Sequence, residues 1–193
     1  MKHPCVLILA SGSPRRRELL DLAGIPYEVD APGVDEACSL PPREAVAELS
    51  RRKALAAAAL HPGRFILAAD TLVALGDTAL TKPADEADAF RMLRALRDRE
   101  HQVHTGVTVI SDSGAIFTET DTSVVSFGPM TDEEIRGYIA TGEPMDKAGA
   151  YALQGKAAMW VRHVSGSPSG IIGLPMYLTR QLLARAGFVF PDV

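Results

Sequence analysis

The chain of 193 residues lacks the features that mark several classes of protein. Its two cysteines, Cys5 and Cys38, are too few for a disulfide framework or a zinc site with Cys/His spacing. Aromatic residues make up 6% of the chain, and no apolar run approaches the roughly 20 residues that a membrane-spanning helix needs. The net charge of -4 is opposite to the basic balance of general nucleic-acid binders. We therefore expect neither a membrane protein nor a nucleic-acid partner.

The composition that remains is ordinary for a globular protein, with 47% hydrophobic and 23% charged residues. The length suggests a single domain, residues 1–193, with two lobes. Cys5 fits a small core position in the first apolar run. That run is short and leads directly into a charged turn, unlike the layout of a signal peptide. We expect a cytoplasmic location.

An unusual group of charges follows this first apolar run. Residues 5–9 fit a buried strand, and Ser13 and Pro14 fit the N-cap and first residue of a helix. Three arginines, residues 15–17, then occupy the first helical turn, where the helix dipole disfavours positive charge. Together with the Ser11 hydroxyl and the free N–H groups of a helix start, they favour binding of a polyphosphate. The alternative is a solvated basic turn.

A second signal is a carboxylate inside an apolar run. Residues 65–75 read as a strand interrupted only by Asp70 and Thr71. Aspartate is disfavoured in strands and is rarely buried without a partner. A carboxylate in such a place needs a cation, a metal or hydrogen-bond donors, and such groups cluster at active sites. The alternative is a turn between two strands.

Further charged residues lie at positions that suit the same chemistry. Lys53 falls within the apolar stripe of a predicted helix over residues 42–60, so it either reaches solvent or projects into a polar pocket. Lys82 follows the end of a predicted strand. Asp35 and Glu36 form an acidic pair in a loop, which is either solvated or part of a metal site.

The remaining pattern predicts an α/β protein with a mixed sheet that is partly antiparallel. Thr131 and Glu134 form a capping box at the start of one helix. Residues 146–155 read as a loop, and residues 165–170 as a flexible turn or lid. The other expected helices cover residues 14–23, 85–98 and 174–186. Residues 24–29 read as a turn and a short strand, and the other expected strands cover residues 78–80, 103–109, 115–120, 122–127 and 157–164.

Pooling these residues predicts hydrolysis of a phosphoanhydride. Cationic and hydroxyl side chains suit a triphosphate, and carboxylates suit a Mg²⁺ or Mn²⁺ ion that bridges phosphate oxygens. Asp70 would orient or deprotonate a water that attacks phosphorus. The pooled candidates on the binding side are Ser11, Ser13, Arg15, Arg16, Lys53 and Lys82, and those on the acidic side are Asp35, Glu36 and Asp70.

Five stretches together resemble the Maf family of septum-formation-inhibitor-like nucleotide pyrophosphatases: residues 11–20, 68–71, 82–83, 146–155 and 173–175. The resemblance implies an ITPase-like (Maf/Ham1) α/β fold, with an elongated mixed sheet, flanking helices and two lobes around a central cleft. It also implies cleavage of nucleoside triphosphates between the α and β phosphates, a divalent metal cofactor and a homodimer.

The resemblance also implies roles for individual residues. Asp70 resembles the proton acceptor and Glu36 a metal or water ligand, and the alternative for Asp70 is to bind the metal together with Glu36. The phosphate-binding positions correspond to Ser13, Arg16, Lys53 and Lys82, and Ser11 joins them from its place in the same turn.

Arg15, Thr71 and Gln154 resemble the positions that set base specificity, in the combination of the dTTP/UTP-directed branch, which also accepts modified pyrimidine analogues in nucleotide-pool cleaning. The alternatives are specificity for 7-methyl-GTP, broad specificity, or a nucleotide-binding regulator of cell division with little catalysis. The loop at residues 165–170 departs from the aromatic-containing version usual in the family.

Overall fold

A computed structural model describes residues 6–191, which contain a seven-stranded mixed sheet with the order β2-β1-β3-β5-β6-β7. Strands β1 and β2 run parallel to each other, and β1 is parallel to β3, whereas the other pairs are antiparallel. β4 pairs with β3 off the main order. The strands are β1 (Leu7–Leu9), β2 (Tyr27–Val29), β3 (Ile66–Leu75), β4 (Thr78–Leu80), β5 (Glu100–Ile110), β6 (Ile116–Phe127) and β7 (Val161–Ser165).

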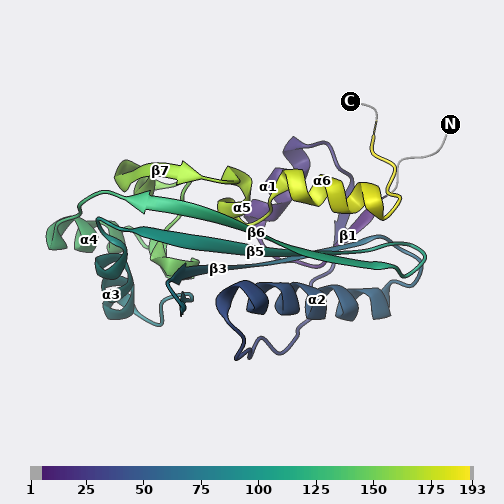
Figure 1. The fold of residues 1–193 in the computed structure, drawn as a ribbon, viewed down its shortest axis with the longest axis horizontal. Coiled ribbons are helices and arrows are strands. Elements are labelled where there is room, and N and C mark those ends of the chain that lie inside the picture. The colour runs from purple at the N-terminus through teal and green to yellow at the C-terminus, as the bar shows by residue number, and fades with distance from the viewer. Residues whose placement is uncertain (1–5, 192–193) are drawn as a thin grey trace.

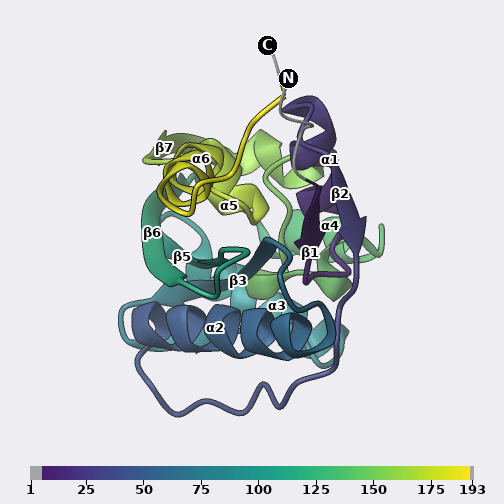
Figure 2. The ribbon, with the colours of Figure 1, turned by 90° about the vertical axis from the view of Figure 1, so that its right-hand side faces the viewer.

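Helices cover both faces of the sheet (Figures 1 and 2). The long helix α2 (Pro42–Leu60) packs on one face against β3 and β5. On the opposite face lie α5 (Pro168–Ile172) and α6 (Met176–Arg185), which contact β5 and β6. The helices α3 (Glu86–Leu96) and α4 (Asp132–Ile139) gather at one end of the molecule, and α1 (Pro14–Leu22) follows β1.

The apolar core is divided into clusters, and β3 passes from one part to the other. The first half of β3, residues 66–69, belongs to two clusters that it shares with β1, α2 and α6. Val73 belongs to a third cluster, built mainly from α3, α4 and the ends of β5 and β6. Asp70 and Thr71 therefore lie where β3 leaves one core and enters the next.

Most predicted elements are present, and β3 is one unbroken strand through Asp70. Residues 116–127 form a single strand instead of two, because Asp121 stays in the ladder opposite Thr105. Residues 165–170, predicted as a flexible turn or lid, instead hold the end of β7 and the start of helix α5, where the Gly170 N–H donates to the Ser167 hydroxyl.

The predicted strand over residues 157–164 is also partly wrong. It begins with a 3-10 helix, η3 (Lys156–Trp160), because the ladder between β6 and β7 shifts register at residues 126–127. The predicted loop at residues 146–155 begins at the last residue of a 3-10 turn, η1 (Glu143–Asp146), and includes a second one, η2 (Ala148–Ala150). The prediction for Cys5 lies outside the described residues.

Among residues 6–191, no helix combines the length and the apolar character needed to cross a membrane.

Gly106 allows α2 to approach the sheet closely, and replacing it by alanine should weaken the fold. A Cβ at this position would lie 2.2 Å from the Val46 carbonyl oxygen, so α2 would have to move away from β5. Overpacking of this kind costs about 1–3 kcal/mol, and we expect Gly106→Ala to lower the free energy of unfolding in urea by at least that much. Gly137→Ala, on the open surface of α4, is the matched control and should be neutral or stabilising. Equal stability of the two variants would contradict the close-packing argument.

Candidate active site

The candidate site lies at an open stretch along the edge of β3. On this edge β1 pairs only with Ile66 and Leu67, and β4 pairs only with residues 73–75. The edge between these two partners, which includes Asp70 and Thr71, therefore faces a gap in the sheet. Because successive side chains of a strand point to opposite faces, Asp70 turns toward α2 and Thr71 toward α5.

A cavity of about 920 Å³ occupies this gap. All ten residues predicted from the sequence for catalysis, phosphate binding, specificity or metal binding line it. They come from the turn after β1, the start of α1, the loop before α2, α2 itself, β3, the segment after β4 and the segment after η2. These residues are Ser11, Ser13, Arg15, Arg16, Glu36, Lys53, Asp70, Thr71, Lys82 and Gln154.

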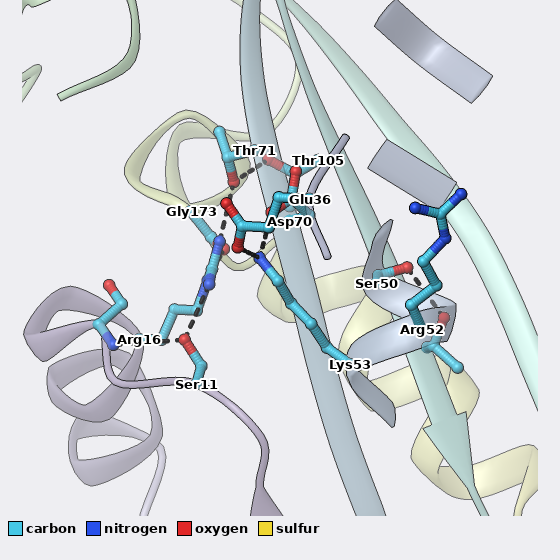
Figure 3. A network of polar contacts seen from close by, with 12 residues as sticks. Ser11, Arg16, Glu36, Ser50, Arg52, Lys53, Asp70, Thr71, Thr105 and Gly173 are labelled. Atoms are coloured by element: carbon cyan, nitrogen blue, oxygen red, sulfur yellow. Dashed lines mark hydrogen bonds and ion pairs between the residues drawn. The ribbon is translucent and has the colours of Figure 1, made fainter. Parts of the chain in front are cut away.

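Lys53 joins the two predicted acidic residues (Figure 3). Its Nζ lies 2.6 Å from Asp70 Oδ1 and 2.7 Å from Glu36 Oε1. Asp70 is only 8% exposed, so its carboxylate needs this ammonium. The hydrogen bond from Lys53 lowers the pKa of Glu36, although partial burial opposes the shift. Of the two alternatives for Lys53, the structure therefore favours the polar pocket over contact with solvent.

Arg16 is held in place by neutral acceptors. Its Nε donates to the Gly173 carbonyl at 2.8 Å, and its two terminal nitrogens donate to Ser11 Oγ at 2.8 Å and to Thr71 Oγ1 at 3.3 Å. Burial lowers the pKa of the guanidinium, and the nearby Asp70 opposes this effect. No carboxylate forms an ion pair with Arg16 within residues 6–191, so its positive charge remains available to an anion. Ser13 occupies the N-cap position of α1, but its side chain makes no capping hydrogen bond.

A directed chain of hydrogen bonds continues from Arg16 through the sheet. Thr71 Oγ1 and Thr105 Oγ1 are 2.9 Å apart, and Thr105 Oγ1 donates to the Gly170 carbonyl at 2.9 Å. Since the Thr105 proton is used on Gly170, the Thr71 hydroxyl must donate to Thr105 while it accepts from Arg16. The chain therefore fixes the orientation of each hydroxyl and ties β3 and β5 to α5.

Three predicted residues keep free polar groups toward the cavity. The side chains of Arg15, Lys82 and Gln154 make no hydrogen bond or ion pair with the part of the chain that the structure describes, and Lys82 and Gln154 are exposed. They are therefore available to a ligand without breaking an internal contact. Asp35, by contrast, does not line the cavity. Its carboxylate accepts the Ala37 N–H, which corrects its inclusion among the acidic candidates.

The acidic residues fit a metal of the magnesium type with an incomplete protein ligand set. Within residues 6–191, no three His, Cys, Asp or Glu side chains are arranged to hold a metal ion. Mg²⁺ commonly takes one or two carboxylates and fills its other positions with water and substrate phosphate oxygens. Asp70 and Glu36, which approach the same Lys53 ammonium, can supply those two carboxylates.

Sequence reasoning did not identify the residues that brace this site. Arg52 donates to the carbonyl oxygens of Asp35 and Ala37, on both sides of Glu36, and so fixes the loop that carries it. Thr105 lies directly opposite Thr71 in the strand register. A threonine on a strand and an arginine on a helix surface are common, and only the register and the path of the loop reveal their roles.

The comparisons with known proteins agree with this arrangement. A family model described as "Maf-like protein" matches residues 6–186. The dTTP/UTP pyrophosphatase of Anaeromyxobacter dehalogenans is 48% identical over 190 residues, which cover 96% of each chain. That of Symbiobacterium thermophilum is 46% identical over 184 residues, or 94% of each chain.

Among solved structures, a HAM1 protein from Coxiella burnetii superposes with a TM-score of 0.51 and 15% identity. The superposition covers 94% of this chain and 99% of that chain. At this identity the match concerns the fold alone, and it confirms the expected ITPase-like (Maf/Ham1) architecture.

Replacing Lys53 by methionine should raise the pKa of Glu36, because the hydrogen bond that lowers it disappears. The folded-state pKa lies below the unfolded one, so the pairing stabilises the fold above the ordinary carboxyl pKa, and this contribution is lost as the pH falls through the lowered value. Carboxyl ¹³C NMR titration in metal-free buffer, assigned with Glu36→Gln, measures the change. The pKa of Glu134, which is lowered by the Thr131 backbone N–H, is the internal control. An unchanged pKa of Glu36 would refute the pairing.

Replacing Thr105 by valine should destabilise the protein, because the Gly170 carbonyl loses its donor and the Thr71 hydroxyl loses its acceptor. Each buried polar group left without a partner costs about 1–3 kcal/mol, and Thr105 is fully buried. Urea unfolding measures the loss. Thr105→Ser keeps the hydroxyl and should retain more stability than the valine variant. The reverse order would show that packing of the methyl group matters more than the hydrogen-bond chain.

Proposed function

The chain belongs to the family of Maf-like proteins, and from this membership and the geometry of the cavity we propose that it is a nucleoside triphosphate pyrophosphatase acting on dTTP and UTP. The observation that carries the chemistry is the buried Asp70 carboxylate at the open edge of β3, held by Lys53 in a cavity with unpaired cations. The full-length similarity to relatives named dTTP/UTP pyrophosphatase supports the choice of substrate.

The triphosphate would bind on the cationic side of the cavity. Arg16 keeps its positive charge there, and Lys82 keeps free donors. The first N–H groups of α1 and the hydroxyls of Ser11 and Ser13 lie in the same turn, where a helix start attracts anions. These groups would neutralise the phosphate oxygens and hold the phosphoanhydride bond beside Asp70.

Asp70 would act as the proton acceptor for the attacking water. Its Oδ1 is held by Lys53, whereas Oδ2 has no hydrogen-bond partner within residues 6–191 and can take a proton. The water oxygen forms a bond to phosphorus, its proton passes to Asp70 Oδ2, and the bond between the α and β phosphates breaks to release pyrophosphate and the monophosphate. A Mg²⁺ or Mn²⁺ ion held by Asp70 and Glu36 would neutralise charge on the phosphate oxygens.

Recognition of the base would fall to Gln154 and Arg15, which line the same cavity. The Gln154 amide can donate and accept along a pyrimidine edge, and Arg15 offers further donors. The Thr71 hydroxyl already donates its proton to Thr105 and accepts a hydrogen bond from Arg16. It can therefore offer the base only its second lone pair, as an acceptor. The same proposal includes a cytoplasmic location, a homodimer and the removal of modified pyrimidine nucleotides. These three points rest on the resemblance to the family.

Pyrophosphate release from a panel of nucleoside triphosphates, with Mg²⁺ or Mn²⁺, tests the function. We expect turnover of dTTP and UTP by the wild type and a loss of about 10²–10⁴-fold in kcat for Asp70→Asn, since a positioned general base contributes that much. Binding of a non-hydrolysable UTP analogue should persist in the variant and is the control.

The other outcomes separate the alternatives. Turnover mainly of 7-methyl-GTP would keep the chemistry and overturn the assignment of base specificity. Binding of triphosphates without any release of pyrophosphate would refute the enzyme and favour a nucleotide-binding regulator.

A further inference from the structure

The short turn that carries Gln154 is held by side-chain hydrogen bonds at both of its ends. On one side, the Ala152 N–H donates to the Tyr138 hydroxyl at 3.3 Å. On the other side, the Lys156 N–H donates to Glu143 Oε2 at 3.2 Å. The two gripping side chains are themselves joined, because the Tyr138 hydroxyl donates to Glu143 Oε1 at 2.7 Å. One tyrosine–glutamate pair therefore holds both ends of the turn.

The turn packs against this pair without spare room. A Cβ at Gly155 would lie 2.1 Å from Glu143 Oε1 and 2.4 Å from its carboxyl carbon. Glycine at this position thus permits the close approach of the backbone to the carboxylate. Gln154, the residue before it, is exposed toward the cavity and makes no internal hydrogen bond within residues 6–191. Its position is therefore set by the backbone of the turn.

The pair is anchored in its own lobe. Tyr138 lies in the last turn of α4 with only 2% of its surface exposed, and burial followed by the bond to Glu143 raises its pKa. The neutral phenol is therefore the form that donates to Glu143 at ordinary pH. The Glu143 backbone is held in turn, because Lys147 Nζ donates to its carbonyl oxygen at 3.0 Å.

We propose that Tyr138 and Glu143 are positioning residues that hold the turn of Gln154 and thereby set the discrimination between nucleobases. The proposal rests on the proposed function, because it assumes that Gln154 reads the base. An amide distinguishes bases only when its donor and acceptor face the matching edge, since hydrogen bonds weaken steeply with misalignment. Loss of the hydrogen bonds at Ala152 and Lys156 would leave the phosphate contacts intact, but the Gln154 amide would no longer be held in line with the edge of the base.

Steady-state kinetics on Tyr138→Phe test the proposal with UTP and CTP as substrates. We expect KM for UTP to rise with kcat nearly unchanged, and the ratio of kcat/KM for UTP over CTP to fall about tenfold, because ground-state and transition-state contacts to the base weaken together. Tyr177→Phe, which removes a phenol from an exposed residue, is the matched control and should keep the wild-type ratio. A preserved ratio in Tyr138→Phe, or an equal loss of kcat on both nucleotides, would overturn the proposal.

Two substitutions of Glu143 should lower the UTP over CTP ratio to different extents. Glu143→Ala removes both acceptors and should lower the UTP over CTP ratio at least as far as Tyr138→Phe. Glu143→Gln keeps one acceptor oxygen and should fall between alanine and wild type. Identical ratios for glutamine and alanine variants, both equal to wild type, would exclude Glu143 from the positioning role.

Amide hydrogen exchange separates failure of this proposal from failure of the proposed function. In Tyr138→Phe the N–H groups of residues 152–156 should exchange faster than in the wild type, while those of β5 stay protected. This readout does not depend on turnover. A wild type that releases no pyrophosphate would refute the function, whereas unchanged exchange at residues 152–156 would refute the grip on the turn.

Discussion

The buried carboxylate of Asp70 is the constraint to which the rest of the site responds. An aspartate in the interior of a strand must be compensated, and the ammonium of Lys53 supplies this at 2.6 Å. For Lys53 to reach it, α2 must lie close to the sheet, and Gly106 permits this because the Val46 carbonyl occupies the space that a side chain would need. The same ammonium then attracts Glu36, which Arg52 presents by holding the carbonyls on either side of it.

The site exists because β3 passes between two cores, while β1 and β4, its neighbours along one edge, each pair with only one part of it. β1 ends at Leu9 and β4 starts its pairing at Val73 of β3, so the intervening edge has no strand beside it. Polar residues at that point are tolerated because they do not interrupt either core. Because side chains alternate along a strand, Asp70 and Thr71 point to opposite faces of the sheet. Asp70 faces the acidic side near α2, and Thr71 faces the hydrogen-bond chain to α5.

The sequence predicted the residues with an improbable environment and missed those with an ordinary one. Asp70 in an apolar run, Lys53 in an apolar stripe and arginines at a helix start each contradict a local preference. All of them except Arg17 line the cavity. Thr105, Tyr138 and Glu143 satisfy their local preferences as a strand threonine, a core tyrosine and a turn glutamate. Their roles depend on the strand register and on the approach of segments far apart in the chain, which local patterns do not encode. For the same reason the single strand β6 was predicted as two, because its ladder to β5 overrides the polar residues at its centre.

Two cations of the site, Lys53 and Arg16, differ in the partners that their hydrogen bonds reach. Lys53 meets two carboxylates, so this group of three carries a net negative charge and attracts a further cation, as a metal-bridged phosphate would supply. Arg16 meets only neutral oxygens, which fix its orientation without cancelling its charge. Positive charge held rigidly beside a negative group is the arrangement that stabilises a transition state without reorganisation, because neither group must move when charge develops. In the proposed function, the phosphoanhydride bond would lie between the two groups and be exposed to both.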